Sequence, residues 1–305
     1  MQAYVLRRLL QLIVTVFVVS LIVFFMVRLK GDPIAVMAPP TFNEEQIAQL
    51  RRAWGFDKPI WDQYVIFITK AVTGDFGQSI QARRPAMELV FERLGYTYLL
   101  TAASALVGTL IAIPLGVLSA IKRNSPLDLL LTGLSSVGTA MPSFWLGLML
   151  ILLFSVTLRI LPAFGALSSE ALIMPAVTLG VGMAARLSRL TRSAMLEILG
   201  EDYVRTARSK GLSSYVVVMR HALRNAMIPV ITVIGLQLGW LLGGSVVVES
   251  VFSWPGLGRL MIESINVRDI TVVQAGLLWF ALSFMLINLA VDIAYTFLDP
   301  RISYT

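Results

Sequence analysis

The chain has 305 residues, of which 57% are hydrophobic and only 14% are charged, and its mean hydropathy is +0.78. Charged residues make up about a quarter of an ordinary soluble protein, so this composition excludes a water-exposed globule and predicts that lipid surrounds much of the chain. The sequence holds no cysteine and a single histidine, His221, which excludes disulfides and metal sites built from thiolates or histidine clusters.

Six apolar runs approach the length of about 20 residues that crosses a bilayer. They cover residues 9–29, 97–121, 133–157, 172–190, 226–249 and 272–296. The first run is too long for a signal peptide and no cleavage site follows it, so we expect an uncleaved span. Pro142 lies inside the third run, where it can kink the helix or mark its true start. We therefore predict an all-α membrane protein with six transmembrane helices.

The basic residues indicate orientation, because short cytoplasmic loops are enriched in lysine and arginine. The formal net charge of +7 comes from residues between the apolar runs, so we attribute it to topology and to contact with membrane lipids, and we expect no nucleic-acid partner. With both termini in the cytoplasm, the short outer loops hold only Arg159, Arg259 and Arg268. The inner segments then hold Arg7, Arg8, Lys122, Arg123, Arg186, Arg189, Arg192, Arg205, Arg208, Lys210, Arg220, Arg224 and Arg301.

Residues 31–95 form a long segment outside the predicted spans. Thr41 and Glu44 match a capping box, and Pro59 opens a second amphipathic helix that Gly74 closes. Both helices are rich in aromatic residues and are expected to pack on the outer membrane face, either as a plain cap or as a binding surface. We therefore divide the chain into an N-terminal transmembrane helix (1–30), an extracytoplasmic amphipathic segment (31–95) and a five-helix core (96–305).

The inner loop at residues 197–224 predicts a short helix with clear ends. Asp202 is expected to be its N-cap, because a carboxylate accepts hydrogen bonds from the free amides at a helix start. Gly211 can supply the left-handed residue that ends the helix, and Lys210 lies beside the negative helix end. Ser213 can then begin the next helix.

One face of this short helix is apolar. Tyr203, Val204 and Ala207 share that face, whereas Arg205 and Arg208 point elsewhere. A rigid amphipathic helix between two spans suits docking into a groove of a partner. The plainer interpretation is a basic loop held by phospholipid head groups.

Several polar residues lie within or beside the predicted spans. Charged side chains inside a membrane usually mark a cavity or a pairing. Glu249, Asn288 and Asp292 are therefore candidates for a translocation path or gate, although a structural pairing of Asp292 is the plainer interpretation. Arg186, near the inner end of the fourth run, is expected to snorkel to lipid head groups. Residues Pro255–Ile265 predict a short external helix.

The inner loop resembles the cytoplasmic EAA loop of bacterial ABC-importer permeases, in the form used by the dipeptide/oligopeptide/nickel family. Asp202-Tyr-Val-Arg-Thr-Ala-Arg-Ser-Lys-Gly-Leu212 is similar to the peptide branch, and His221-Ala-Leu-Arg-Asn-Ala-Met-Ile-Pro-Val230 to its next block. Arg205-Thr206-Ala207 stands where the general motif has Glu-Ala-Ala, so it departs at two positions. Further similar blocks, in family order, are Gly31-Asp-Pro33, Gly74-Asp-Phe-Gly-Gln-Ser79, Leu190-Thr-Arg-Ser-Ala-Met195, Phe252-Ser-Trp-Pro-Gly-Leu-Gly-Arg259 and Asp299-Pro-Arg-Ile302.

The resemblance implies the permease subunit of a binding-protein-dependent importer for peptides or similar small solutes in the bacterial cytoplasmic (inner) membrane. It implies three kinds of partner: a homologous second permease, two ATPase subunits and an extracytoplasmic substrate-binding protein. It also implies that residues 203–211 dock on an ATPase subunit and couple its motion to alternating access. The residues expected to carry this coupling are Asp202, Tyr203, Arg205, Thr206, Ala207, Arg208, Lys210 and Gly211.

The chain lacks a phosphate-binding loop, since no lysine follows a glycine. We therefore expect no catalytic residue, no metal site and no cofactor on this chain, with ATP and Mg²⁺ on the partner ATPase. The alternative is a secondary transporter or channel, which would show repeated halves with broken helices or acidic residues at mid-membrane. An intramembrane enzyme is a third class, but no catalytic constellation is evident.

Overall fold

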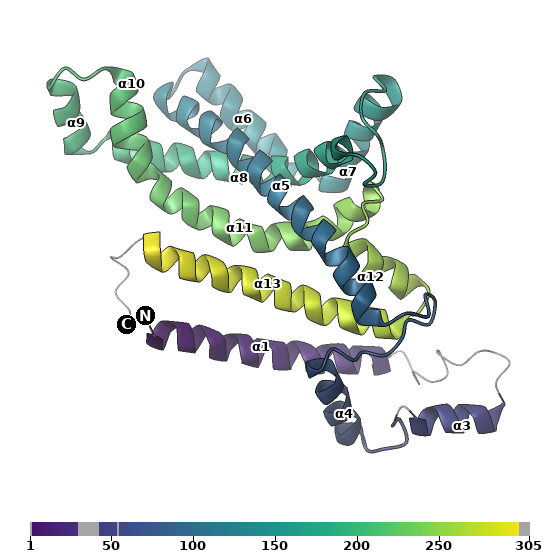
Figure 1. Ribbon diagram of the computed structural model, residues 1–305. Coiled ribbons are helices and arrows are strands. Elements are labelled where there is room, and N and C mark those ends of the chain that lie inside the picture. Colours follow the sequence, from purple (N-terminus) through teal and green to yellow (C-terminus); the bar gives the residue numbers. More distant parts are fainter. Residues whose placement is uncertain (1, 30–42, 54, 299–305) are drawn as a thin grey trace. The chain divides into compact units, whose positions relative to one another are not determined.

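The computed structural model describes residues 2–29, 43–53 and 55–298, and within them the regular elements are helices, with one isolated bridge between Gln78 and Pro85 (Figure 1). The all-α prediction is confirmed. The elements are α1 (Gln2–Leu29), α3 (Glu44–Ala53), α4 (Ile60–Val72), α5 (Ala86–Ile121), α6 (Pro126–Ala140), α7 (Ser143–Leu150), η1 (Ile151–Thr157), η2 (Ser169–Leu172), α8 (Ile173–Leu199), α9 (Asp202–Ser209), α10 (Ser214–Val216), η3 (Val217–Ala222), α11 (Leu223–Val251), α12 (Leu257–Asn266) and α13 (Ile270–Leu298).

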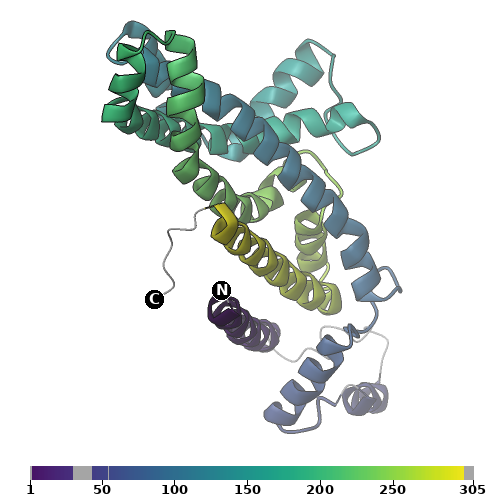
Figure 2. The ribbon, with the colours of Figure 1, turned by 60° about the vertical axis from the view of Figure 1, so that its left-hand side comes forward.

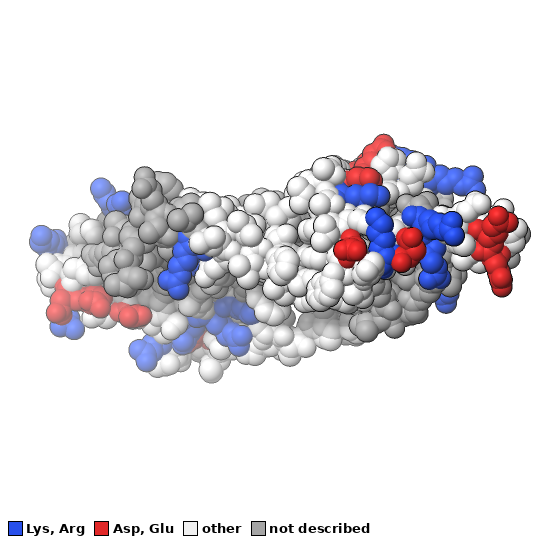
Figure 3. Space-filling view, turned by 90° about the horizontal axis from the view of Figure 1, so that it is seen from below, with Lys and Arg blue, Asp and Glu red and all other residues white. Residues whose placement is uncertain are grey.

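Five of the described helices or helical runs are long and apolar enough to cross a membrane, and a bent pair makes a sixth when its two arms count as one span. On α1, α5 and α11 the exposed side chains include many large apolar ones. On the face shown in Figure 3, a broad stretch of the described surface carries neither acidic nor basic side chains. Such a surface fits contact with lipid tails.

The third predicted span, residues 133–157, is a sharply bent pair of helices, and Pro142 marks the start of the second arm, one of the two outcomes expected for it. Its first arm, α6, begins at Pro126, and the chain breaks before the second arm, α7 and η1, with a bend of 105° between them. Met141 has an extended backbone (φ −77°, ψ 122°) because the ring of Pro142 disfavours a helical residue before it. Pro142 therefore ends one helix and starts the next.

The chain forms two compact units. Unit 1 contains Met1–Tyr96 and Pro255–Leu286, and unit 2 contains Thr97–Trp254 and Ile287–Thr305. Each has its own apolar core: in unit 1 the start of α5 packs with α12 and α13, and in unit 2 the core centres on α8 with parts of α5 and α11.

Within unit 1, α4 packs on α1 through aromatic side chains. The hydroxyls of Ser20 and Tyr64 hydrogen-bond at 2.8 Å, and the rings of Phe24 and Tyr64 meet edge to face at 5.3 Å. The predicted capping box also needs correction: Thr41 lies outside the described residues, and Asn43 and Gln46 form the reciprocal bonds at 2.8 and 3.0 Å.

Unit 2 is built around α8, which packs closely on α5, α6 and α11. Glycines permit the contact with α5: a Cβ atom added to Gly116 would lie 2.5 Å from the Thr191 Cβ atom and 2.7 Å from the Ser188 carbonyl oxygen. Gly108 and Gly180 make the same kind of contact farther along the two helices. Small residues at such crossings allow backbones to approach closely in a membrane.

A buried ion pair joins α6 to α8. The Asp128 carboxylate accepts two hydrogen bonds from Arg192, from Nε at 2.8 Å and from Nη2 at 2.7 Å. It also accepts one from the backbone amide of Asn124 at 2.9 Å and one from the Ser119 hydroxyl. The side chain of Asp128 is 4% exposed and that of Arg192 27%. The end of α5, the start of α6 and the second half of α8 are therefore tied at one point, which we call the Asp128 clamp.

We predict that Asp128→Asn destabilises the protein by about 3 kcal/mol, since it leaves a largely buried guanidinium without its counter-charge. The matched control is Glu263→Gln, which removes an exposed pair with Arg259 (2.6 Å, side chains 34% and 55% exposed) and should cost about 1 kcal/mol or less. Unfolding midpoints in detergent check both values, and equal losses in the two variants would contradict the assigned role of the clamp.

We further predict that Gly116→Ala destabilises unit 2 by about 1–3 kcal/mol, because the added methyl group forces α5 away from α8. Gly133→Ala on α6 is the control, since nothing lies within 4 Å of its added Cβ atom. That control should be neutral or stabilising by up to about 1 kcal/mol, as alanine favours a helix. The same unfolding assay checks this, and a neutral Gly116→Ala variant would refute the close contact.

Candidate functional site

The predicted inner-loop helix exists as α9, between the end of α8 and the segment that leads into α11. Figures 1 and 2 show α9 lying beside that segment in both views. One predicted detail is wrong: Asp202 is the first helical residue, and the N-cap position belongs to Glu201, which makes no side-chain capping bond. The extended backbone needed before a helix already occurs at Glu201 (φ −68°, ψ 147°), so Asp202 enters the first turn.

The C-terminal end of α9 is as predicted. Gly211 has φ +76°, the left-handed region that favours glycine, and its amide donates to the Arg208 carbonyl at 2.9 Å. Lys210 occupies the C-cap position, and Ser213 is the N-cap of α10. The chain therefore reverses sharply after one short helix.

Two residues hold α9 to the rest of unit 2. Val204 is fully buried and Ala207 is 6% exposed, and both pack with Val217 of η3. Ile198 and Leu199, at the end of α8, complete this small apolar cluster. Consequently α9 is attached both to the end of α8 and to the start of the α11 segment.

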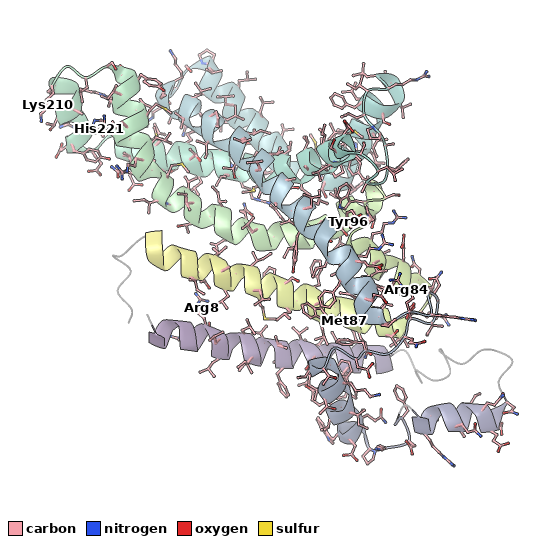
Figure 4. The ribbon with its side chains drawn as sticks, viewed as in Figure 1. Arg8, Arg84, Met87, Tyr96, Lys210 and His221 are labelled. Atoms are coloured by element: carbon pink, nitrogen blue, oxygen red, sulfur yellow. The ribbon has the colours of Figure 1, made fainter. Side chains whose placement is uncertain are left out.

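The opposite face of α9 is exposed and polar. Arg205 and Asp202 form an exposed ion pair at 3.3 Å, which contributes little stability. The exposed residues of this face are Asp202, Arg205, Thr206, Arg208, Ser209 and Lys210. Figure 4 shows Lys210 on the outer side of α9 and His221 on the neighbouring helical segment.

Tyr203 occupies the border between the two faces. Its ring is 40% exposed, and its hydroxyl accepts a hydrogen bond from the Asn225 side chain at 2.7 Å. The sequence prediction placed Tyr203 on the apolar face, whereas the structure gives it a polar bond to the start of α11.

Glu249, a predicted path residue, is fully buried near the end of α11. The Thr97 hydroxyl on α5 donates to its Oε1 atom at 2.7 Å, and the Trp254 amide donates to its backbone oxygen at 2.8 Å. In this conformation the carboxylate joins α5 to α11.

Asn288 and Asp292 lie one turn apart on α13 and are partly buried. The neighbouring Val291 packs against Gly235 of α11. Gly235 precedes Glu249 by fourteen residues, or about 21 Å along the helix. The structure therefore does not bring Asp292 together with Glu249.

Sequence reasoning missed two polar clusters. One is the Asp128 clamp, and the other joins Ser79 to Asp269 in unit 1: the Ser79 hydroxyl donates to Asp269 Oδ2 at 2.5 Å, and Thr271 donates to Oδ1 at 2.9 Å. Ser79 ends the block Gly74–Ser79 described above, whereas Asp269 lies 190 residues later, beside Arg268 of a predicted outer loop. A single sequence gives no signal that two such distant segments meet.

Comparisons with known proteins cover both parts of the chain. Residues 1–101 match the family described as "Binding-prot-dependent transport system membrane comp, N-term", and residues 112–304 match "Binding-protein-dependent transport system inner membrane component". The chain is 46% identical over 302 residues, 99% of either chain, to the glutathione transport system permease protein GsiC of Escherichia coli (strain K12), and it is as similar to GsiC of Salmonella paratyphi A.

Solved structures support the fold. An inward-facing form of the MetNI methionine ABC transporter superposes with a TM-score of 0.61 at 23% identity, over 70% of this chain and 97% of that one. An amino acid ABC transporter gives a TM-score of 0.53 at 17% identity, over 70% and 94%. On the strength of the two family matches and the full-length identity, the chain belongs to the binding-protein-dependent transport system inner membrane components, the permeases of ABC importers.

Proposed function

We propose that ATP hydrolysis on a partner subunit drives this permease through α9. The observation that carries the proposal is the two-sided character of α9. Its inner face is fixed to two long helices by Val204 and Ala207, while its outer face presents Arg205, Arg208 and Lys210 to a partner. A helix held in this way transmits a push as a rigid body.

The partners follow from the family to which the chain belongs and from what its sequence lacks. Since the sequence has no phosphate-binding loop, ATP and Mg²⁺ bind on two ATPase subunits. A homologous second permease completes the passage, and an extracytoplasmic binding protein delivers the solute. The solutes are peptides or related small molecules such as glutathione, the solute named for the similar permease GsiC.

The orientation follows from the position of α9, which must face the cytoplasm to meet an ATPase. If the bent pair counts as one crossing, four candidate spans precede α9 and two follow it. Both counts are even, so the two termini lie on the same side as α9. This supports cytoplasmic termini and an extracytoplasmic position for α3 and α4.

The force then follows the contacts of unit 2. Closure of the ATPase pair displaces α9, and the cluster around Val204 passes the displacement to α8 and α11. The Asp128 clamp carries it to α5 and α6, so these helices move together between inward- and outward-facing arrangements. We assign the gate to Glu249, which its bond to Thr97 supports, and the lining of the path to Asn288 and Asp292.

We predict that Gly211→Pro abolishes solute uptake but leaves ATP hydrolysis by the assembled complex. Proline requires φ near −65°, whereas this residue has φ +76° and an amide that donates a hydrogen bond, so the turn after α9 breaks at a cost of about 3 kcal/mol. Uptake and ATPase rates in proteoliposomes that contain the complete importer measure the two activities separately.

Gly211→Asn is the matched control, because asparagine adopts the left-handed conformation more readily than other residues. It should keep most of the uptake. Normal import by the proline variant would show that α9 and its turn do not couple the two activities.

A further inference from the structure

The exposed face of α8 differs in chemistry from those of its neighbours. On α5, α6 and α11 the exposed large side chains include Leu106, Leu110, Leu129, Leu134, Leu236 and Trp240, all apolar. In the second half of α8, by contrast, the exposed residues are Arg186, Arg189, Ser193 and Glu197. Their spacing of three and four residues places them on one side of the helix. We call this set the α8 stripe.

The contacts of α8 fix the depth of the stripe. Arg192 pairs with Asp128 at the start of α6, beside the turn that connects α5 to α6. Arg186 lies six residues before Arg192, about 9 Å farther into the span, and Arg189 about 4.5 Å. The hydroxyls of Ser188 and Ser135 hydrogen-bond at 2.9 Å. Ser135 is seven residues beyond Asp128 on α6, so this part of α8 also lies deeper in the span than the Asp128 clamp. Arg186 is therefore well inside the membrane-spanning part of unit 2.

The positive charge of the stripe is not balanced locally. Among the described residues, no carboxylate pairs with Arg186 or Arg189, and each side chain is exposed. Glu197, on the same stripe, is eight residues from Arg189, about 12 Å along the helix. Charged residues within spans face a protein interior or a water-filled cavity, and they mark solute pathways. Snorkelling of one arginine to lipid would not explain a face that is polar over three turns.

We propose that the α8 stripe lines the inner half of the solute path and that Arg186 and Arg189 bind the carboxylate group of the passing solute. A guanidinium holds a carboxylate through two parallel hydrogen bonds, and the pair of arginines concentrates anions at this level. The inference rests on the proposed function and adds a solute class to it: molecules with a free carboxylate, such as peptides with an unmodified C-terminus.

Thiol labelling of the complete importer tests the proposal, because this chain has no cysteine of its own. Ser193→Cys places one thiol on the stripe, and its reaction is followed with two small thiosulfonates, one carrying a sulfonate and one a trimethylammonium group. We expect the anionic reagent to react about tenfold faster, the lower end of electrostatic focusing in a cleft. When Arg186→Gln and Arg189→Gln are added to Ser193→Cys, the anionic and the cationic reagent should react at equal rates.

Two controls separate the path from its alternatives. Leu134→Cys, on the apolar face of α6 beside Ser135, should react with neither reagent. A dipeptide with a free carboxylate should slow the reaction of the anionic reagent at Ser193→Cys, and the corresponding dipeptide amide should not.

Three results would overturn the proposal: no reaction at Ser193→Cys, equal rates for the two reagents while both arginines are present, or equal protection by dipeptide and amide. The assay is run in phosphatidylcholine alone and with phosphatidylglycerol. An anion preference that disappears when phosphatidylglycerol is added would identify lipid head groups as the occupant and also overturn the proposal.

The labelling is done without nucleotide, so its result does not depend on whether α9 couples ATP hydrolysis to transport. If the Gly211→Pro variant imports normally but Ser193→Cys keeps its anion preference, the role of α9 fails and the path survives. If uptake is lost in Gly211→Pro but the preference is absent, the path assignment fails alone.

Discussion

The close packing of α8 against α5 and α6 is the interaction on which the rest of unit 2 depends. Lipid tails offer no hydrogen bonds and little hydrophobic drive between helices, so contact must come from backbone proximity and from paired polar groups. Gly116 provides the close backbone approach, against Thr191, and the Asp128 clamp provides the paired polar groups one turn away. Because both occur in the half of α8 that leads to α9, a displacement of α9 meets a stiff helix pair instead of a loose loop.

This arrangement gives a physical meaning to a loop that is otherwise only basic and exposed. The buried residues Val204 and Ala207 fix α9, and its exposed face carries Arg205, Arg208 and Lys210, which the proposed docking would bring to an acidic groove of the ATPase. Exposed ion pairs are individually weak, so the shape and attachment of the helix matter more than any one charge. In the proposed mechanism α9 passes its displacement to α8, and α8 also carries the α8 stripe with Arg186 and Arg189. One helix, α8, would then take part in both the motion and the solute contact.

Much of the fold could be predicted from the sequence, because length and hydropathy alone indicate helices that cross a bilayer. The apolar face of α9 and its end at Gly211 also follow from local patterns, whereas the exact N-cap shifted by one residue to Glu201. The sequence predicts that Pro142 either kinks the third span or starts a helix, but it does not predict the 105° bend, since proline restricts the preceding residue without setting the angle between the helices. The partners of Asp128 and Glu249 could not be predicted, because a single sequence does not reveal which helices pack together.

The proposed contact between α9 and an ATPase subunit is tested most directly by photo-crosslinking. Thr206→Cys, on the exposed face of α9, carries the only thiol of the chain and can hold a short photoreactive probe. In the complete importer, irradiation should join this position to an ATPase subunit, while a probe at Leu129→Cys on the apolar face of α6 should not. An α9 probe that reacts only with lipid or solvent, in the presence and absence of ATP, would contradict the account.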